Sequence, residues 1–327
     1  MTRTTGRQAA LAELCDRLFA SLPRSDQRRT GRDYIRGLLD TEGRKSFRNM
    51  AASLGGDANL EQRLHHFASC STWDWRPMRR ALARHMTATA VPDAWVVRPL
   101  VIPKEGDNTV GVHQRYVPTL GQVLNAQYAV GLWAASRGRC YPVGWRLLLT
   151  HDWLDDPARR AQGGIPDDRT AESYVDAAIE AYLDLVAGMT GPSVRRPLVL
   201  AADTDAVRAI HRLRAAGAPF VVRADPGLPL HAAGPAPAPV RVRSPFHPAG
   251  PSDDLLLIDA DQTWLTNQLD TDPAALHALT TLPTTVDDSC ARITDHVGLR
   301  DFTGRTYAGW NRHTTLVSAA HCLTLLA

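Results

Sequence analysis

The chain has 327 residues, of which 44% are hydrophobic and 22% are charged, and its formal net charge is +3. This composition excludes a disordered chain and suffices for one large domain or two ordinary ones. No apolar run approaches the roughly 18 residues of a membrane span. Residues 1–7 lack the apolar stretch of a secretory signal, so we expect a cytoplasmic protein without membrane partners. The five cysteines lie far apart without any C-x-x-C spacing, which argues against a disulfide framework or a zinc site.

Helical spacing dominates the first ninety residues of the chain. Apolar residues recur at helical intervals around Leu14 and around Leu38, and the links between these runs contain Pro23 and Gly43. We therefore predict an all-helical N-terminal module over residues 1–92, which the family resemblance described below makes DNA-binding-like.

Short runs of β-branched and aromatic residues begin after this module, at residues 95–102, 127–135 and 141–150, with a hairpin turn at 136–139. An amphipathic helix beginning near Thr170 follows them. Next come a buried strand, a helix and a short strand, at residues 197–202, 207–213 and 220–223. Antiparallel strands followed by helix, strand, helix, strand is the order expected of an RNase H-like domain. The predicted fold class is thus α/β, an RNase H-like mixed sheet with flanking helices, whose first part spans residues 93–224.

The remaining chain divides into two segments. Residues 225–283 are predicted to be a short irregular or β-containing insertion, with an extended Pro-rich connector at 234–239 and an exposed strand at 240–243. Residues 284–327 are predicted to complete the core with C-terminal helices.

Several sequence motifs occur here in the same order as in one known protein family. They lie at residues 19–29, 34–39, 73–77, 103–112, 114–116 and 309–313. Through them the chain resembles an IS701/IS4-type DDE transposase, a DDE superfamily endonuclease, over most of its length. The resemblance implies an RNase H-like core with three acidic residues that hold two divalent metal ions, Mg²⁺ or Mn²⁺, for hydrolysis and strand transfer at transposon ends.

The resemblance implies three acidic positions in this sequence, and only one of them holds an acidic residue. The first falls on Arg98 or Pro99, the second on Asp203, and the third on His296, with Asp295 beside it. A guanidinium about 4 Å from a unit charge interacts with it by roughly 4 kcal/mol at an effective dielectric of 20, and a dication doubles the repulsion. We therefore expect no metal or other cofactor unless the protein is catalytic. We also predict that Arg98 pairs with Asp203; the alternative is that Asp203 caps the following helix.

Arginine supplies almost all of the basic charge, because only two of the 37 basic residues are lysines. Clustered arginines suit phosphate contacts, although solvated helix faces explain each cluster about as well. The predicted DNA-binding residues are Arg28, Arg29, Arg32, Arg36, Arg76, Arg79, Arg80, Arg84, Lys104 and Arg312.

Two classes of function stay open at this point. In the first, the protein is a transposase-derived factor that has lost its nuclease and binds double-stranded DNA as a domesticated or regulatory protein, with a homodimer as one possible assembly. It would then be associated with the nucleoid. In the second, the scaffold binds a protein partner or an anionic small ligand in a cleft near Arg98, His296 and Arg300. Minor alternatives are a decaying gene product and an active transposase with a shifted triad of Asp203, Asp295 and a neighbour such as Asp93 or Asp107.

Overall fold

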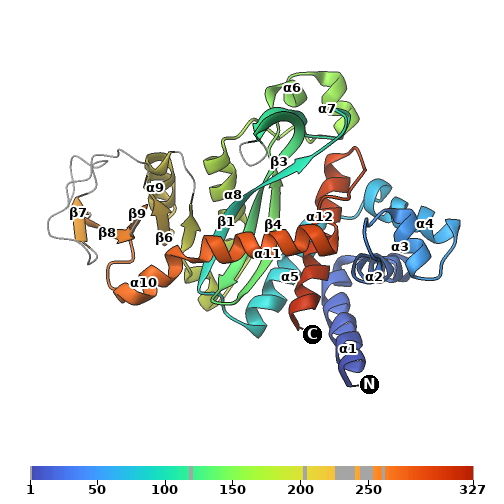
Figure 1. Ribbon diagram of the computed structural model, residues 1–327, viewed down its shortest axis with the longest axis horizontal. Coiled ribbons are helices and arrows are strands. Elements are labelled where there is room, and N and C mark those ends of the chain that lie inside the picture. Colours follow the sequence, from blue (N-terminus) through green and yellow to red (C-terminus); the bar gives the residue numbers. More distant parts are fainter. Residues whose placement is uncertain are drawn as a thin grey trace.

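A mixed sheet of nine strands runs through the described part of the chain (Figure 1). The computed structural model describes residues 2–117, 121–201, 205–224, 240–243, 253–259 and 262–326. The strands are β1 (Ala94–Pro103), β2 (Val112–Val117), β3 (Gln122–Ser136), β4 (Arg139–Leu147), β5 (Leu198–Leu200), β6 (Phe220–Arg223), β7 (Val240–Arg243), β8 (Asp253–Asp259) and β9 (Gln262–Thr266). Their order is β2-β3-β1-β5-β6-β9-β8-β7, and β4 also pairs with β3.

The strand β1 lies inside this order and is paired on both sides. It runs antiparallel to β3, with Ala94 opposite Ala135, and parallel to β5, with Trp95 opposite Leu198. β4 is antiparallel to β3, and β6 is parallel to β5. Antiparallel strands followed by parallel strands that alternate with helices are the arrangement predicted for an RNase H-like domain, and this prediction is confirmed.

Helices cover both faces of the sheet and form a further layer at its side (Figure 1). α8 (Tyr174–Val186) and α9 (Ala206–Ala215) lie on one face, and α11 (Leu282–Val297) and α12 (Tyr307–Leu326) lie on the other. The predicted N-terminal helices are α1 (Thr2–Leu18), α2 (Ser25–Asp40), α3 (Phe47–Ser53), α4 (Ala58–His65) and α5 (Trp75–Thr89). Of these, α1, α2 and α5 pack against α12, and α3 and α4 pack against α2. The shorter elements are η1 (Phe19–Ser21), η2 (His66–Cys70), α6 (His151–Leu154), α7 (Pro157–Gly163), η3 (Pro192–Arg195) and α10 (Pro273–Thr280). Among the described helices, none has the length and apolarity that crossing a membrane requires.

Strand alternation decides which side chains each helical layer meets. Arg98 and Trp145 both pair with Gly131 of β3, so all three lie on the same face of the sheet. The Trp145 indole Nε1 donates to the Ser318 hydroxyl of α12 at 2.8 Å, which identifies this face as the one under α11 and α12. The neighbouring Arg146 points to the opposite face, where α8 lies.

A capping serine sets the start of α8. The Ser173 hydroxyl accepts a hydrogen bond from the backbone N–H of Asp176 at 3.1 Å, so the helix begins at Tyr174. The sequence pattern predicted a start near Thr170. The difference arises because periodicity locates an apolar face, whereas the cap fixes the boundary.

The segment predicted as an insertion continues the sheet. β9 pairs antiparallel with β6, with Val221 opposite Thr266, and β8 and β7 extend the order further. The predicted strand at 240–243 is confirmed as β7, whereas the predicted connector at 234–239 lies outside the described residues. The boundaries proposed between the N-terminal module, the core and the insertion stay predictions.

Polar side chains of α12 bind the N-terminal helices inside one shared core. The imidazole of His313 is 2.9 Å from the Tyr34 hydroxyl through Nδ1 and 3.0 Å from the carbonyl oxygen of Gly298 through Nε2. Because a carbonyl only accepts, Nε2 carries the hydrogen, and Nδ1 accepts from Tyr34. Burial lowers the pKa of His313 to about 4, so the ring is neutral at physiological pH.

We predict that the free energy of unfolding decreases as the pH falls from 6.5 towards 4. Burial lowers the pKa of His313 and of His321 from 6.5 to about 4, so within this range the unfolded chain binds protons that the folded chain does not. Each histidine then contributes a loss of about 1.4 kcal/mol per pH unit. Urea unfolding across this range measures the slope, and His313→Gln, which keeps a donor and an acceptor, removes about half of it. An unchanged slope in this variant would contradict the assignment.

Candidate functional site

A bidentate ion pair joins the middle of β1 to α11. Arg98 donates from Nε to Oδ1 of Asp287 at 2.7 Å and from Nη2 to Oδ2 at 2.6 Å. Its Nη1 lies 3.4 Å from the carbonyl oxygen of Ala201, the residue after β5. The Arg98 side chain is 20% exposed and that of Asp287 is 48% exposed. One guanidinium therefore links the central strand, the end of the next strand and the helix that crosses them.

The strand geometry explains why Arg98, rather than Pro99, meets α11. Side chains alternate along β1, so Pro99 points to the opposite face. Beneath Arg98 the neighbouring strand carries Gly131, where a Cβ would lie 2.7 Å from the ring of Trp145 and 2.9 Å from that of Trp133. The glycine thus lets the two indoles fill the sheet surface below the ion pair.

Among the described residues, the side chain of Arg98 contacts Asp287 and not the predicted positions Asp295 and His296. Asp203 lies outside the described residues, so its pairing with Arg98 stays a prediction. Asp295 and His296 are exposed near the end of α11, and nine residues of helix, roughly 13 Å, separate His296 from Asp287. A cleft lined jointly by Arg98 and His296 stays a prediction. Sequence reasoning missed Asp287, and its only signal was the acidic dipeptide with Asp288.

The ion pair does not fit a divalent metal ion. Both carboxylate oxygens of Asp287 accept from Arg98, whose fixed positive charge would repel a dication. Among the residues that the structure describes, no three His, Cys, Asp or Glu side chains gather closely enough to hold a metal ion. The neighbouring thiol offers no ligand either, because burial and the charge of Asp287 raise the pKa of Cys290 to about 11.

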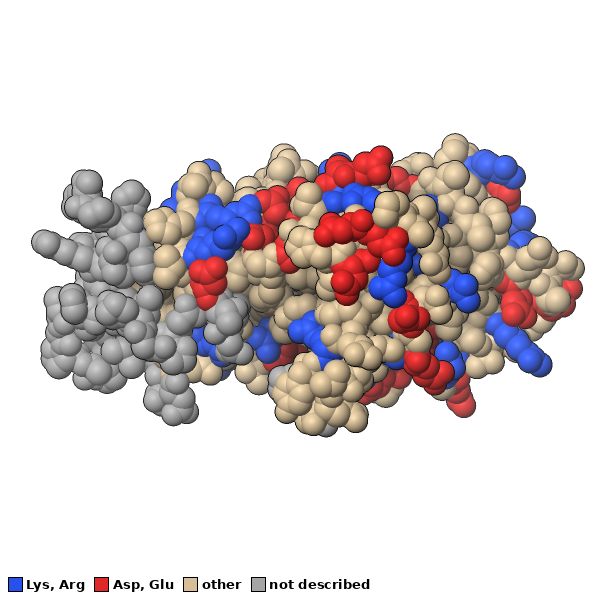
Figure 2. Space-filling model, turned by 90° about the horizontal axis from the view of Figure 1, so that it is seen from above, with Lys and Arg blue, Asp and Glu red and all other residues tan. Residues whose placement is uncertain are grey.

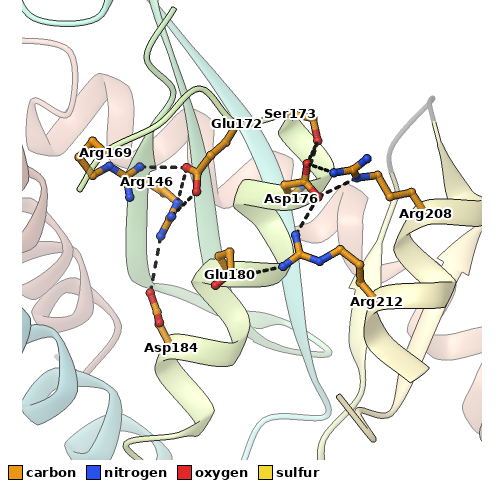
Figure 3. A network of polar contacts seen from close by, with 9 residues as sticks. All are labelled: Arg146, Arg169, Glu172, Ser173, Asp176, Glu180, Asp184, Arg208 and Arg212. Carbon is orange, nitrogen blue, oxygen red and sulfur yellow. Dashed lines mark hydrogen bonds and ion pairs between the residues drawn. The ribbon is translucent and has the colours of Figure 1, made fainter. Parts of the chain in front are cut away.

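The acidic side chains of α8 and of the segment before it are already paired with arginines (Figure 3). Glu172 accepts from Arg146 and from Arg169. Burial by itself would raise the pKa of Asp176, but hydrogen bonds from Arg208, Ser173 and Arg212 outweigh it and lower this pKa to about 2. These pairs fasten α8 to β4 and to α9, and they leave its carboxylates compensated. We assign them a structural role.

The shifted triad stays a prediction, because Asp203 lies outside the described residues and Asp93 and Asp107 are alternatives for its third member. Asp93 precedes β1 and Asp107 follows it, so the ten residues of the strand, roughly 33 Å, separate them. Asp107 also pairs with Arg159 at 3.3 Å, on the side of α7.

Three of the predicted DNA-binding residues are used inside the protein. Arg79 donates to the backbone carbonyls of Trp145 and Asn311 and to side chains of α12, and burial lowers its pKa to about 9. Arg312 is 5% exposed and donates to the Trp73 carbonyl at 3.0 Å. Lys104 donates to the carbonyl of Phe302 at 2.8 Å, and burial lowers its pKa to about 8. Their donors are spent on buried acceptors, so we remove them from the candidate DNA contacts.

The other seven candidate residues lie on α2 and α5. Arg28 donates to the Leu22 carbonyl, Arg32 pairs with Asp16, and Arg76 lies 3.7 Å from Asp74. The exposed members without an ion-pair partner among the described residues are Arg29, Arg36, Arg80 and Arg84. Figure 2 shows basic and acidic side chains interspersed on the face that it presents, rather than gathered in one basic stripe.

We predict that Arg98 and Asp287 are energetically coupled. In a double-mutant cycle with Arg98→Met and Asp287→Asn, urea unfolding should give a coupling energy of about 1 kcal/mol, because Asp287 is half exposed and water screens the pair. The matched control is Asp288→Asn, which changes the adjacent acid on α11. Equal coupling of Arg98 to both positions would contradict the observed pair.

Comparison with known proteins fits this architecture. A search of the curated proteins found no match. The family described as DDE superfamily endonuclease matches residues 17–282, well over half of the chain. This range contains Arg98 and Asp203 and ends at Leu282, where α11 begins. The chain therefore belongs to the DDE superfamily endonuclease family.

Proposed function

We propose that this protein is a transposase-derived, IS701-like DNA-binding factor that no longer cuts DNA by the metal-dependent chemistry of its family. The observation that carries the proposal is the bidentate pair between Arg98 and Asp287. In this pair the guanidinium of Arg98 lies between β1 and α11 as a fixed positive charge.

The proposal assigns the three acidic positions of the family anew. Arg98 stands at the first position, Asp203 at the second, and Asp287 replaces His296 at the third, because Asp287 is the residue of α11 that meets β1. Only the first carboxylate is then missing. Its replacement is nonetheless decisive, since a dication about 4 Å from the guanidinium is opposed by roughly 8 kcal/mol at an effective dielectric of 20.

DNA contacts are assigned to the arginines of α2 and α5 whose guanidinium groups stay available. These are Arg29, Arg36, Arg80 and Arg84, which are exposed and have no ion-pair partner among the described residues. Phosphate contacts of this kind do not depend on the nuclease centre, so binding can persist after cleavage is lost. A role as a domesticated regulatory factor at the nucleoid would follow from such binding.

We predict that affinity for duplex DNA falls steeply with salt. Each phosphate contact contributes about −0.9 to the slope of log affinity against log salt, so Arg80→Ala with Arg84→Ala should reduce the slope by about 2. The same applies to Arg29→Ala with Arg36→Ala. Gel shifts over a salt series measure the slope, with the exposed Arg139→Ala as a control. Affinity indifferent to salt would refute DNA binding through these arginines.

We predict that millimolar Mn²⁺ neither supports DNA cleavage by the natural protein nor raises its thermal unfolding midpoint. Arg98→Asp exchanges the opposing cation for a carboxylate and should gain a midpoint that rises with Mn²⁺. Arg98→Asn, which removes the cation without adding a ligand charge, is the matched control, and circular dichroism establishes that both variants fold. Cleavage by the natural protein, or an equal Mn²⁺ response in all three, would overturn the proposed role of Arg98.

A further inference from the structure

A second group of arginines lies near the N-terminal ends of β1 and β5. Ala201, which contacts Arg98, lies at the other end of β5. Arg137, Arg195 and Arg196 line a cavity of about 350 Å³ together with Asp93. Asp93 immediately precedes β1, and Arg196 is two residues before β5, so the cavity opens at the N-terminal ends of these two parallel strands. Its other wall consists of Ala275, Ala278, Leu279 and Leu282, from α10 and the start of α11.

The backbone that carries Arg195 and Arg196 is held firmly. Gly191 has a φ of +89° and begins the short turn that ends before Pro197. The buried Ser193 accepts a hydrogen bond at its carbonyl oxygen from the indole of Trp95 at 2.9 Å. The two arginines are thus fixed to the base of the central strand before any ligand arrives.

Arg137 approaches the cavity from a second tight turn. It lies between β3 and β4, next to Gly138, whose φ is +79°. The Ser136 hydroxyl accepts from the backbone N–H of Asp93 at 3.0 Å, which joins this turn to the start of β1. Two separately anchored turns therefore bring three guanidinium groups to one cavity.

The positive charge of this cavity is not compensated within the described residues. Arg137, Arg195 and Arg196 have no ion pair there, in contrast to Arg146 and Arg208, which are paired. The Nε of Arg196 is buried and has no hydrogen-bond partner there either. An anion in the cavity would supply this buried donor with an acceptor.

We propose that this cavity binds a phosphate group. Three guanidinium groups and the carboxylate of Asp93 sum to a charge of +2, which a phosphate dianion neutralises. Guanidinium forks match phosphate oxygens in geometry and form charge-assisted hydrogen bonds with them. The apolar wall suits the organic part of a small phosphate ester, and the volume lies in the range of small-molecule sites. None of these residues belongs to the proposed DNA contacts, so the site goes beyond the proposed function.

The test uses inorganic phosphate as the probe and the full chain as the protein. Thermal unfolding is followed while phosphate replaces chloride at constant ionic strength. At ten times its dissociation constant, phosphate should raise the midpoint by about 2 °C. Arg137→Ala, Arg195→Ala and Arg196→Met should each weaken phosphate binding at least tenfold. The control is Arg139→Ala, which lies beside the same turn but outside the cavity lining and should leave phosphate binding unchanged. Midpoints without phosphate establish that each variant folds.

A second arm identifies the source of the phosphate group. If Arg195→Ala lowers the salt slope of duplex DNA binding by about 1, the site takes a backbone phosphate. If the slope is unchanged while phosphate stabilises the natural protein, the ligand is a free phosphate ester. The proposal is overturned if phosphate leaves the midpoint unchanged and the slope is also unaltered, or if phosphate stabilises the arginine variants as much as the natural protein. Because the first arm needs no DNA, its result is separate from that of the proposed function.

Discussion

A fixed positive charge at the centre of the sheet has to be compensated, and Asp287 compensates it. Arg98 stands on a strand that is paired on both sides, so its side chain can only point towards α11 or away from it, and alternation directs it to α11. The bidentate pair then sets which turn of α11 lies over β1. An internal ion pair closes the contact between β1 and α11, and the proposed loss of cleavage rests on that pair.

Arginine has three distinct environments in this protein, although its clusters look alike in the sequence. Arg79 and Arg312 are buried against neutral acceptors and hold α12 to its neighbours. Arg146 is paired with acids around α8 and holds the other helical layer. The guanidinium groups that stay unpaired on α2, on α5 and around the cavity of Arg196 are those available to phosphates.

The C-terminal helix contributes to stability rather than to chemistry. Its motif from Trp310 to His313 is buried, and each polar member has a partner on another element or on its own helix. His313 in particular joins Tyr34 of α2 to the loop after α11. This arrangement unites the N-terminal helices with the core, and it makes the protein sensitive to acid because the ring is neutral when folded.

The sequence by itself determined the family, the order of strands and helices around β1, and the absence of a carboxylate at Arg98, since motifs and periodicity are local properties of the chain. It could not place the start of α8, which depends on the Ser173 cap, or recognise that β9 extends the sheet. Only the tertiary structure placed Asp287 against Arg98, directed the donors of Arg79, Arg312 and Lys104 to acceptors within the protein, and brought Arg137 to the same cavity as Arg196. The physical reason is that periodicity shows which face of an element is apolar, whereas the residues that meet across two elements depend on how those elements pack.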